Sequence, residues 1–266
     1  MSTIPNFIEI PVNPEIAQKE FEVYSKPSTL TDKPFHYCPG CGHSTVHKLL
    51  MEVVEEMGIQ GDIVGVAPVG CSVFAYDYLD IDMQQAAHGR ALAVATGIRR
   101  MLPDKLVFTY QGDGDLAAIG TAETLHAANR GENILTIFIN NAVYGMTSGQ
   151  MAPTTLEKMV TTTSPFGRDV STQGYPLKIS ELLAMLPGVT YVTRQSVHTT
   201  ANVRKTKKAL RKAIELQQEG KGFCLVEVVS NCPSNWKMTP LQSQQFIQEK
   251  MIPFYPLGDI KTPEGK

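Results

Sequence analysis

One stretch decides the fold: residues 105–141 read KLVFTYQGDGDLAAIGTAETLHAANRGENILTIFINN. It comprises an apolar strand at 105–111, an alanine-rich helix at 116–129 and a second apolar strand at 134–139. Right-handed crossover makes the two strands of such a β-α-β unit parallel, so their carboxyl ends lie on the same side of the sheet. Ligands of open α/β sheets bind outside those ends. The stretch therefore predicts a ligand site that contains Asp113 and Asn141.

Two kinds of phosphate site fit this unit. Gly112, Gly114 and Ala117 satisfy the G-x-G-x-x-G/A pattern of dinucleotide-binding folds. Against that interpretation, Asp113 would repel the pyrophosphate, and the next strand ends in asparagines instead of the acidic residue that binds ribose. A phosphate that arrives with Mg²⁺ fits better, because Asp113 and Asn141 offer the hard oxygen ligands that this ion prefers. The helix that follows would point its positive end at the phosphates.

The rest of the chain continues the alternation of strands and helices. We expect helices at 44–57, 88–102 and 200–218 and strands at 63–69, 189–193 and 223–229. Continuous apolar strands alternating with helices predict an α/β fold with a mostly parallel sheet and helices on both faces. Helices 88–102 and 116–129 are apolar nearly all round, so we expect both to be buried.

The expected domain organisation follows from proline content and motif positions. Residues 1–34 are punctuated by prolines and are expected to form an extended arm, which lies on a partner subunit or is disordered. Residues 35–258 are expected to form one cofactor-binding domain, and residues 259–266 a C-terminal tail.

Composition excludes several classes of protein. The chain has 266 residues, of which 42% are hydrophobic and 19% charged, with a formal net charge of −2. This balance gives no reason to expect nucleic acid or a membrane surface as partner. No apolar window is long enough to span a bilayer, and the first residues do not resemble a secretory signal. Five cysteines, an odd number, argue against a disulfide framework and favour a cytoplasmic protein.

The cysteines suggest a metal or iron–sulfur site. Cys38 and Cys41 form a C-x-x-C pair, which by itself fits a redox pair or half of a zinc site. Cys71 and Cys232 follow predicted strands on the side of the phosphate site. Four converging thiolates would suit Zn²⁺ or an iron–sulfur cluster, and spacing does not choose between them. Cys224 lies inside an apolar strand and is expected to be a core residue.

A resemblance to a known family emerges from the order of the motifs. The motifs are CPGCGHS, PVGCS, HGRALAVATGIRR, GDGDLAAIG, INNAVYGMTSGQMAPTT, FGRD and SNCPSNW. In this order they resemble the β (thiamine-diphosphate-binding) subunit of 2-oxoacid:ferredoxin oxidoreductases over residues 35–258. The resemblance implies a PP-type domain that binds thiamine diphosphate. It also implies Mg²⁺ bound by Asp113, Asn141 and the Val143 carbonyl, and one [4Fe–4S] cluster held by Cys38, Cys41, Cys71 and Cys232.

The same resemblance implies further site residues. The residues expected to bind the cofactor are Gly70, Cys71, His88, Gly112, Asp113, Gly114, Asp115, Asn141, Val143, Tyr144 and Thr147. His88 is assigned to the cofactor or the substrate adduct as a catalytic residue, without a defined proton role. Tyr144 and Thr147 are expected to line the diphosphate and thiazolium pocket.

The implied reaction converts a 2-oxo acid, coenzyme A and oxidised ferredoxin into acyl-CoA, CO₂ and reduced ferredoxin. In this family the glutamate that activates the aminopyrimidine comes from a pyrimidine-binding domain on another chain. The resemblance therefore implies an enzyme that is active only with an alpha subunit, together with gamma and ferredoxin-like subunits.

The substrate and two rival functions stay open. Met146 stands where pyruvate-specific members carry Asn, and Ser148-Gly149 where they carry a double glycine. These differences favour 2-oxoglutarate or a branched-chain 2-oxo acid over pyruvate. The alternatives are a pyruvate-specific member, a non-catalytic iron–sulfur or zinc scaffold, and a stand-alone thiamine decarboxylase. The basic residues between 203 and 212 fit either the solvated face of a helix or a docking surface for ferredoxin.

Overall fold

The computed structural model describes residues 24–264. Most of the predicted arm, residues 1–23, lies outside this range. Within the rest of the arm, Leu30 is buried in the core and forms an isolated antiparallel bridge with Leu79. Thr29 is also buried, and its hydroxyl donates to the Met51 carbonyl at 3.0 Å. Residues 27–31 therefore pack onto the domain as part of it.

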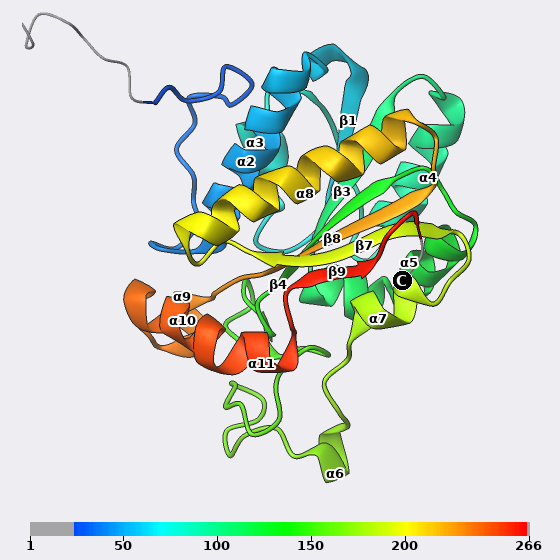
Figure 1. The fold of residues 1–266 in the computed structure, drawn as a ribbon. Helices are drawn as coiled ribbons and strands as arrows, with labels where there is room; N and C mark the ends of the chain where they lie inside the picture. The colour runs from blue at the N-terminus through cyan, green and yellow to red at the C-terminus, as the bar shows by residue number, and fades with distance from the viewer. Residues whose placement is uncertain (1–23, 265–266) are drawn as a thin grey trace, which may run out of the picture.

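A seven-stranded sheet forms the centre of the molecule (Figure 1). Its strands are β1 (Ile63–Ala67), β2 (Asp82–Gln85), β3 (Leu106–Gly112), β4 (Leu135–Asn140), β7 (Val189–Ser196), β8 (Phe223–Val229) and β9 (Gly258–Lys261). The order across the sheet is β2-β1-β3-β4-β8-β7-β9, and every pair is parallel except β7 with β9. The predicted mostly parallel α/β sheet is confirmed. The sheet also extends past residue 258, where the predicted domain ended.

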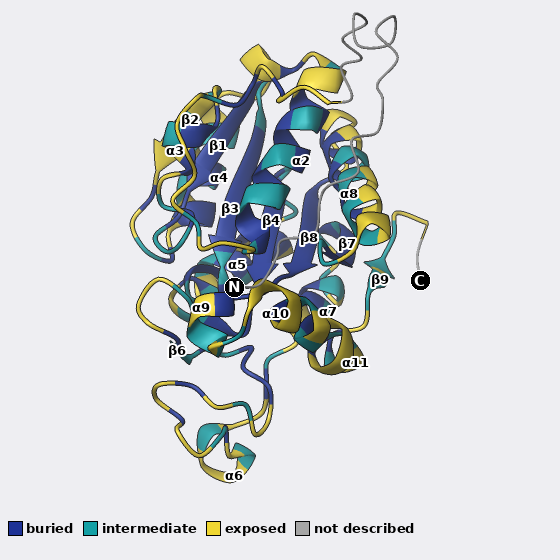
Figure 2. Ribbon diagram, turned by 90° about the vertical axis from the view of Figure 1, so that its left-hand side faces the viewer, coloured by how far each residue is buried: buried dark blue, intermediate teal, exposed yellow. Residues whose placement is uncertain are grey.

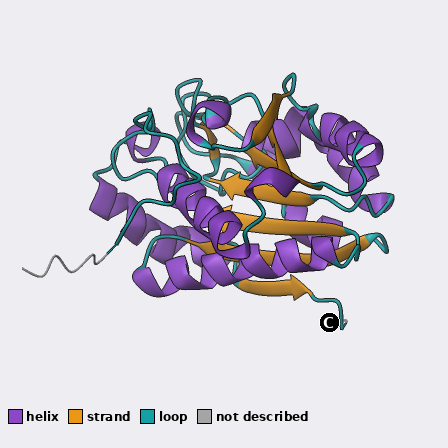
Figure 3. Ribbon diagram, turned by 90° about the horizontal axis from the view of Figure 1, so that it is seen from above, coloured by secondary structure: helices purple, strands orange, loops and turns teal. Residues whose placement is uncertain are grey.

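Helices cover both faces of this sheet (Figures 1 and 3). On one face lie α2 (Gly42–Met57) and α8 (Thr200–Gln218); on the other lie α4 (Ala91–Met101), α5 (Thr121–Asn129) and α7 (Ile179–Ala184). Each face has its own apolar cluster, because successive residues of a strand point to opposite sides. On β4, for example, Ile137 belongs to the α2–α8 cluster and Phe138 to the other.

Short elements surround the strand ends. They are α3 (Ala75–Tyr78), the two-stranded β5 (Val143–Tyr144) and β6 (Gln150–Met151), α6 (Val170–Gln173), α9 (Pro233–Trp236), α10 (Pro240–Phe246) and α11 (Ile252–Phe254). A 3₁₀ turn at Gln60–Asp62 and two π turns, at Asp115–Ile119 and Ile247–Met251, are further short elements. None of the helices within residues 24–264 is both long and apolar enough to cross a membrane.

A long excursion between β6 and α7 projects from the body and carries α6 (Figure 2). The buried guanidinium of Arg168 holds its base together by donating to the carbonyls of Ala152, Pro153, Thr155, Gln173, Gly174 and Tyr175. The excursion leaves Phe166 and Tyr175 exposed, at 100% and 77% of their surfaces.

Two predicted helices differ from the structure. The stretch 116–129 is interrupted: a π turn at Asp115–Ile119 precedes α5, with Gly120 between them. A side chain at Gly120 would place its Cβ 2.2 Å from the Asp115 carbonyl, so only glycine fits this break. The helix predicted at 88–102 begins at Ala91, and neither α4 nor α5 is buried all round. Ala93 and Gly97 face solvent because the sheet covers only one side of α4.

Some of the basic residues of α8 have partners within the described part of the chain. Lys207 Nζ lies 2.7 Å from both Glu52 Oε2 and Glu56 Oε1 of α2, and Arg211 also pairs with Glu56. These exposed or partly exposed ion pairs join the two helices that cover one face of the sheet. Within residues 24–264, two of the six basic side chains of this helix form ion pairs, and a third, Lys212, places its Nζ 4.7 Å from the centroid of the Tyr191 ring.

Packing of α8 against the sheet generates a stability prediction. Leu210 is fully buried, whereas Lys208 on the same helix is exposed. We expect Leu210→Ala to lower the free energy of unfolding by about 2–5 kcal/mol, because it removes apolar contacts and leaves a cavity. The matched change Lys208→Ala should stay within about 0.5 kcal/mol of the parent. Urea unfolding followed by circular dichroism measures both, and equal effects would contradict this packing.

Candidate functional site

A cavity of about 350 Å³ opens at the carboxyl ends of β1, β3 and β4. The structure brings together here every residue that the sequence assigned to the cofactor. Gly70 and Cys71 come from the loop after β1, and His88 from the turn before α4. Gly112 ends β3, and Asp113, Gly114 and Asp115 follow it; Asn141, Val143, Tyr144 and Thr147 follow β4. Parallel strand alignment is the cause, because it gathers four separate loops at one edge of the sheet.

Asp113 is the buried carboxyl group at this edge, with 3% of its surface exposed. Asn141 N donates to its Oδ2 at 3.2 Å, and the Thr154 hydroxyl donates to its Oδ1 at 2.9 Å. Burial raises the pKa of Asp113 to about 8, although these hydrogen bonds oppose the shift. The ionised form is therefore costly without a cation beside it.

The chain turns sharply immediately after β4. Asn140 Oδ1 accepts from Ala142 N at 3.3 Å, and Asn141 Oδ1 accepts from Val143 N at the same distance. Ala142 adopts a left-handed backbone with φ of 59°, a strained conformation for a residue with a side chain. The Thr155 hydroxyl fixes this conformation by donating to the Ala142 carbonyl at 2.5 Å. We call residues 140–143 the asparagine corner.

Three kinds of oxygen meet here and could bind a hard metal ion. They are the carboxylate of Asp113 and the amide and carbonyl oxygens of the asparagine corner. Such oxygens are suited to Mg²⁺ with phosphate oxygens as further ligands. The glycines around them leave room for a ligand: a Cβ at Gly70 or Gly112 would meet nothing within 4 Å.

Asp115, the second carboxylate of the Gly-Asp-Gly-Asp run, has a different role from Asp113. Its Oδ1 accepts from His88 Nδ1 at 2.7 Å, from Gly89 N at 2.8 Å and from Val69 N at 3.3 Å. Its Oδ2 accepts from Gln111 Nε2 at 2.6 Å. With four donors, Asp115 fixes the loop after β1 and the turn before α4 against β3. Because a carboxylate only accepts hydrogen bonds, His88 donates from Nδ1 to Asp115. The other ring nitrogen, Nε2, therefore points away from Asp115.

Four of the five cysteines lie beside the cavity. Burial first, and then the thiols of Cys232, Cys41 and Cys38, raise the pKa of Cys71 to about 12. Cys38 is exposed, Cys41 and Cys71 are half-buried and Cys232 is buried. Cys224 lies apart in β8 within the apolar core.

Gly145 separates two of these thiols. A Cβ built at this position would lie 3.0 Å from Cys71 Sγ and 3.5 Å from Cys232 Sγ. Asn235 Nδ2 donates to the Gly145 carbonyl at 2.7 Å and to Cys232 Sγ at 3.2 Å. Across residues 24–264, no three His, Cys, Asp or Glu side chains are grouped tightly enough to hold a single metal ion. The cysteines of a four-iron cluster, by contrast, each bind a different iron.

Sequence reasoning missed several residues of this site. His43 lines the cavity, its Nδ1 lies 3.1 Å from the Tyr110 hydroxyl, and burial lowers its pKa to about 3. Gly145, Thr154 and Asn235 were also not singled out. A signal existed for each, because all four stand inside the motifs CPGCGHS, INNAVYGMTSGQMAPTT and SNCPSNW.

Comparison with known proteins agrees with this geometry. The family model "Thiamine pyrophosphate enzyme, C-terminal TPP binding domain" matches residues 68–228. The ketoisovalerate oxidoreductase subunit VorA of Methanothermobacter thermautotrophicus is 49% identical over 85% of this chain and 47% of its own length. The 2-oxoglutarate synthase subunit KorB of Methanocaldococcus jannaschii is 36% identical over 87% of this chain and 83% of its own. The chain thus spans about half the length of the ketoisovalerate oxidoreductase subunits that it matches.

A solved structure has the same fold. It is a chain of the 2-oxoglutarate:ferredoxin oxidoreductase from Magnetococcus marinus, with 2-oxoglutarate, coenzyme A and succinyl-CoA bound. It superposes with a TM-score of 0.74 at 25% identity, covering 91% of this chain and 86% of that chain.

The four bonds to Asp115 generate a prediction. We expect Asp115→Asn to lower the free energy of unfolding by about 2–3 kcal/mol, because an amide nitrogen would face donors that a carboxylate accepts. Asp104→Asn, at an exposed position, is the matched control and should change stability by less than about 0.5 kcal/mol. Chemical denaturation measures both variants. If the two variants unfold alike, Asp115 does not hold the cavity walls.

Proposed function

This chain belongs to the 2-oxoacid:ferredoxin oxidoreductase subunits that carry the thiamine pyrophosphate-binding domain, and on that premise we propose its function. It binds Mg²⁺ and thiamine diphosphate in the strand-end cavity. Together with partner subunits, it catalyses CoA-dependent oxidative decarboxylation of a 2-oxo acid. One observation carries the proposal: the buried Asp113 carboxyl group meets the asparagine corner at the cavity, beside the thiols of Cys71 and Cys232.

The metal ligands in this proposal are Asp113 Oδ, Asn141 Oδ1 and the Val143 carbonyl. The environment of Asp113 supports the assignment, because its hydrogen-bond donors there are a hydroxyl and a backbone N–H, both uncharged. A divalent ion would offset the burial that raises the pKa of this carboxyl group. Hard carboxylate and carbonyl oxygens favour Mg²⁺ over softer ions.

Thiamine diphosphate, when bound, supplies a carbanion for attack on the keto carbon and an electron sink after CO₂ leaves. The residues of this chain bind and orient it. Gly70, Gly112 and Gly114 let the diphosphate approach the backbone. The Tyr144 ring packs closely on Gly114: a Cβ at this position would lie 3.1 Å from the ring. We assign His88 to the reacting end, because Asp115 fixes its ring with Nε2 available.

The electron acceptor in this proposal is a [4Fe–4S] cluster held by Cys38, Cys41, Cys71 and Cys232. Their shared position beside the cavity supports it, because electrons then travel a short distance from cofactor to cluster. In this proposal Cys71 belongs to both sites, because it lines the cavity and lies, with Cys232, against Gly145. A ferredoxin is the proposed external acceptor.

The proposed substrate is a branched-chain 2-oxo acid or 2-oxoglutarate, in preference to pyruvate. The ketoisovalerate and 2-oxoglutarate enzymes among its relatives support this order. So does Met146, which lines the cavity and is 50% exposed, as an apolar contact for a substrate larger than pyruvate.

The partners in this proposal are an alpha subunit with the pyrimidine-binding domain, and gamma and ferredoxin-like subunits. Ile119 and Met146 line the cavity yet leave half of their surfaces exposed, which supports closure by a second chain. The partner would hold the aminopyrimidine and supply the activating glutamate. Dependence on coenzyme A and ferredoxin fits an assembly in the cytoplasm.

Reconstitution tests this function directly. We expect 2-oxo acid- and CoA-dependent reduction of a viologen dye only when the chain is combined with its pyrimidine-domain partner. 3-Methyl-2-oxobutanoate and 2-oxoglutarate should be oxidised faster than pyruvate. Robust turnover by the chain alone would refute the shared site and favour a stand-alone decarboxylase. A reconstituted complex that binds cluster but never turns over would favour the non-catalytic scaffold.

The cysteines supply an independent prediction. We expect Ser substitution of Cys38, Cys41, Cys71 or Cys232 to remove most of the iron and acid-labile sulfide from anaerobically purified protein. Cys224→Ser is the matched control and should retain both, since Cys224 lies in the core away from the other thiols. If Cys224→Ser loses its iron and Cys232→Ser keeps it, the fourth ligand of the cluster is Cys224 and not Cys232.

A further inference from the structure

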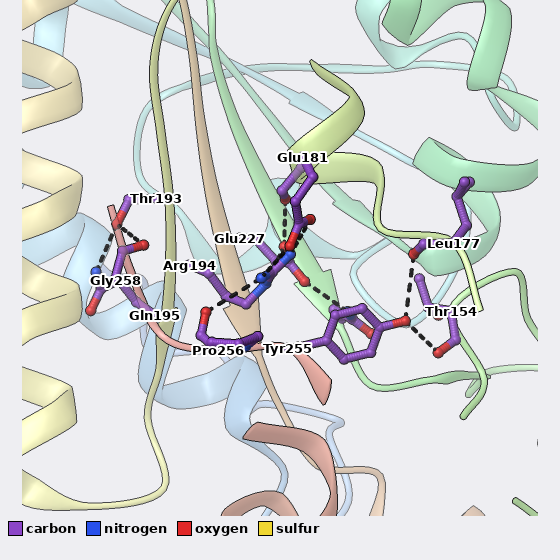
Figure 4. Close-up of polar contacts among 12 residues, drawn as sticks. Thr154, Leu177, Glu181, Thr193, Arg194, Gln195, Glu227, Tyr255, Pro256 and Gly258 are labelled. Atoms are coloured by element: carbon purple, nitrogen blue, oxygen red, sulfur yellow. Dashed lines mark hydrogen bonds and ion pairs between the residues drawn. The ribbon is translucent and has the colours of Figure 1, made fainter. Parts of the chain in front are cut away.

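A buried ion pair joins two strands of the sheet, β7 and β8, next to the strand that leads into the asparagine corner. Arg194 of β7 and Glu227 of β8 are adjacent in register, and each is only 1% exposed. Arg194 Nε lies 2.7 Å from Glu227 Oε2. The other end of the guanidinium pairs with Glu181 of α7 at 2.6 and 2.9 Å (Figure 4).

Stability alone does not account for this pair. Residues 223–229 are otherwise apolar apart from Cys224, and all seven are buried. Replacing a buried ion pair by apolar side chains is often neutral or stabilising by about 1–4 kcal/mol. An apolar pair at 194 and 227 would therefore serve the sheet as well. Only the charged pair presents a carboxylate oxygen toward the neighbouring strand β4.

That oxygen holds the asparagine corner. Asn140 Nδ2 donates to Glu227 Oε1 at 2.7 Å, and Asn140 Oδ1 accepts from Ala142 N at 3.3 Å. The Asn140 side chain thus links the ion pair to the strained backbone of Ala142, whose neighbours Asn141 and Val143 carry the proposed metal ligands. Asn140 and Glu227 are buried, so water does not compete for these bonds.

A second chain of contacts leads from Arg194 to Asp113. The guanidinium lies over the Tyr255 ring, 5.2 Å from its centroid. The Tyr255 hydroxyl donates to the Thr154 carbonyl at 2.7 Å (Figure 4), and the Thr154 hydroxyl donates to Asp113 Oδ1 at 2.9 Å. Both sides of the proposed metal site therefore rest on the same buried arginine.

We propose that the Arg194–Glu227 pair is a positioning device for the metal site, acting through Asn140 to hold the asparagine corner in its ligating conformation. This inference rests on the proposed function, because it assigns a purpose to the pair only if Mg²⁺ binds at Asp113 and Asn141. Arg194, Glu227 and Asn140 are positioning residues; none of them is a proposed ligand of the metal.

Glu227→Gln tests the contact between the ion pair and Asn140, because it removes the negative charge and one of the two acceptor oxygens. The carboxylate accepts from three donors: Arg194, Asn140 and the Ser180 hydroxyl. A glutamine has one oxygen, which the charged guanidinium retains, and its NH₂ then faces the NH₂ of Asn140. Asn140 must move, and the corner moves with it. Loss of such outer contacts commonly weakens metal binding about 10–100-fold.

The experiment measures thiamine diphosphate binding to the reconstituted complex by calorimetry while Mg²⁺ is varied. We expect Glu227→Gln and Asn140→Ala to raise the Mg²⁺ concentration at half-maximal binding about 10–100-fold, with iron content unchanged. Glu181→Gln is the matched control: it removes a charge from the same Arg194 without touching Asn140, and should shift the midpoint less than about threefold. Asp113→Ala removes a proposed metal ligand and serves as the reference in which no Mg²⁺-dependent binding of thiamine diphosphate is expected.

Each outcome is decisive. A structural defect lowers the amount of cofactor bound at saturation, whereas a positioning defect shifts the midpoint. If both variants keep the midpoint within twofold, or if Glu181→Gln shifts it equally, the positioning role is overturned. Should Glu227→Gln fail to fold, Glu227→Asp takes its place, since it keeps the charge beside Arg194 and withdraws the carboxylate oxygen from Asn140. Absence of Mg²⁺-dependent binding in the parent complex would instead refute the proposed function.

Discussion

The structure depends on one constraint: a buried carboxyl group stands at the point where two parallel strands end. Strands β3 and β4 pair in register from Phe108 with Leu135 to Gly112 with Ile139. Asp113 follows Gly112 directly, and Asn141 stands two residues past Ile139 at the end of β4. The strand pairing therefore brings the two residues together, and the Asn141 N–H donates to the carboxyl group. Burial without a charged partner raises the pKa of Asp113, which makes this edge of the sheet a place where a cation lowers the free energy.

The segment that follows β4 joins this edge to the thiols. Asn141 and Val143 face the cavity, Tyr144 lines its wall, and Gly145 lies against Cys71 and Cys232. One short segment therefore contacts the proposed metal, cofactor and cluster sites in succession. Asn235 fixes the far end of the segment by bonding both the Gly145 carbonyl and the Cys232 sulfur.

The surface around the cavity differs from the surface over the sheet. Over the sheet, α2 and α8 are joined by ion pairs, with apolar side chains beneath them. Around the cavity, Ile119 and Met146 are half exposed, and the excursion held by Arg168 exposes Phe166 completely. Exposed apolar area of this kind is typical of surfaces that bind other chains. The asymmetry agrees with a subunit whose site is completed by a partner at the strand ends.

The sequence by itself determined the repeated strand–helix order, the parallel sheet and the loops that meet at its edge. These features depend on local periodicity and on the handedness of the crossover, which act within one β-α-β unit. Only the tertiary structure decided that Asp115 fixes His88, that Gly145 separates two thiols and that Arg194 and Glu227 support the asparagine corner. A glutamate amid apolar residues in 223–229 and an arginine in the neighbouring strand were visible signals. Their partners were not, because strand register and side-chain direction arise from packing between segments distant in sequence, which no local pattern encodes.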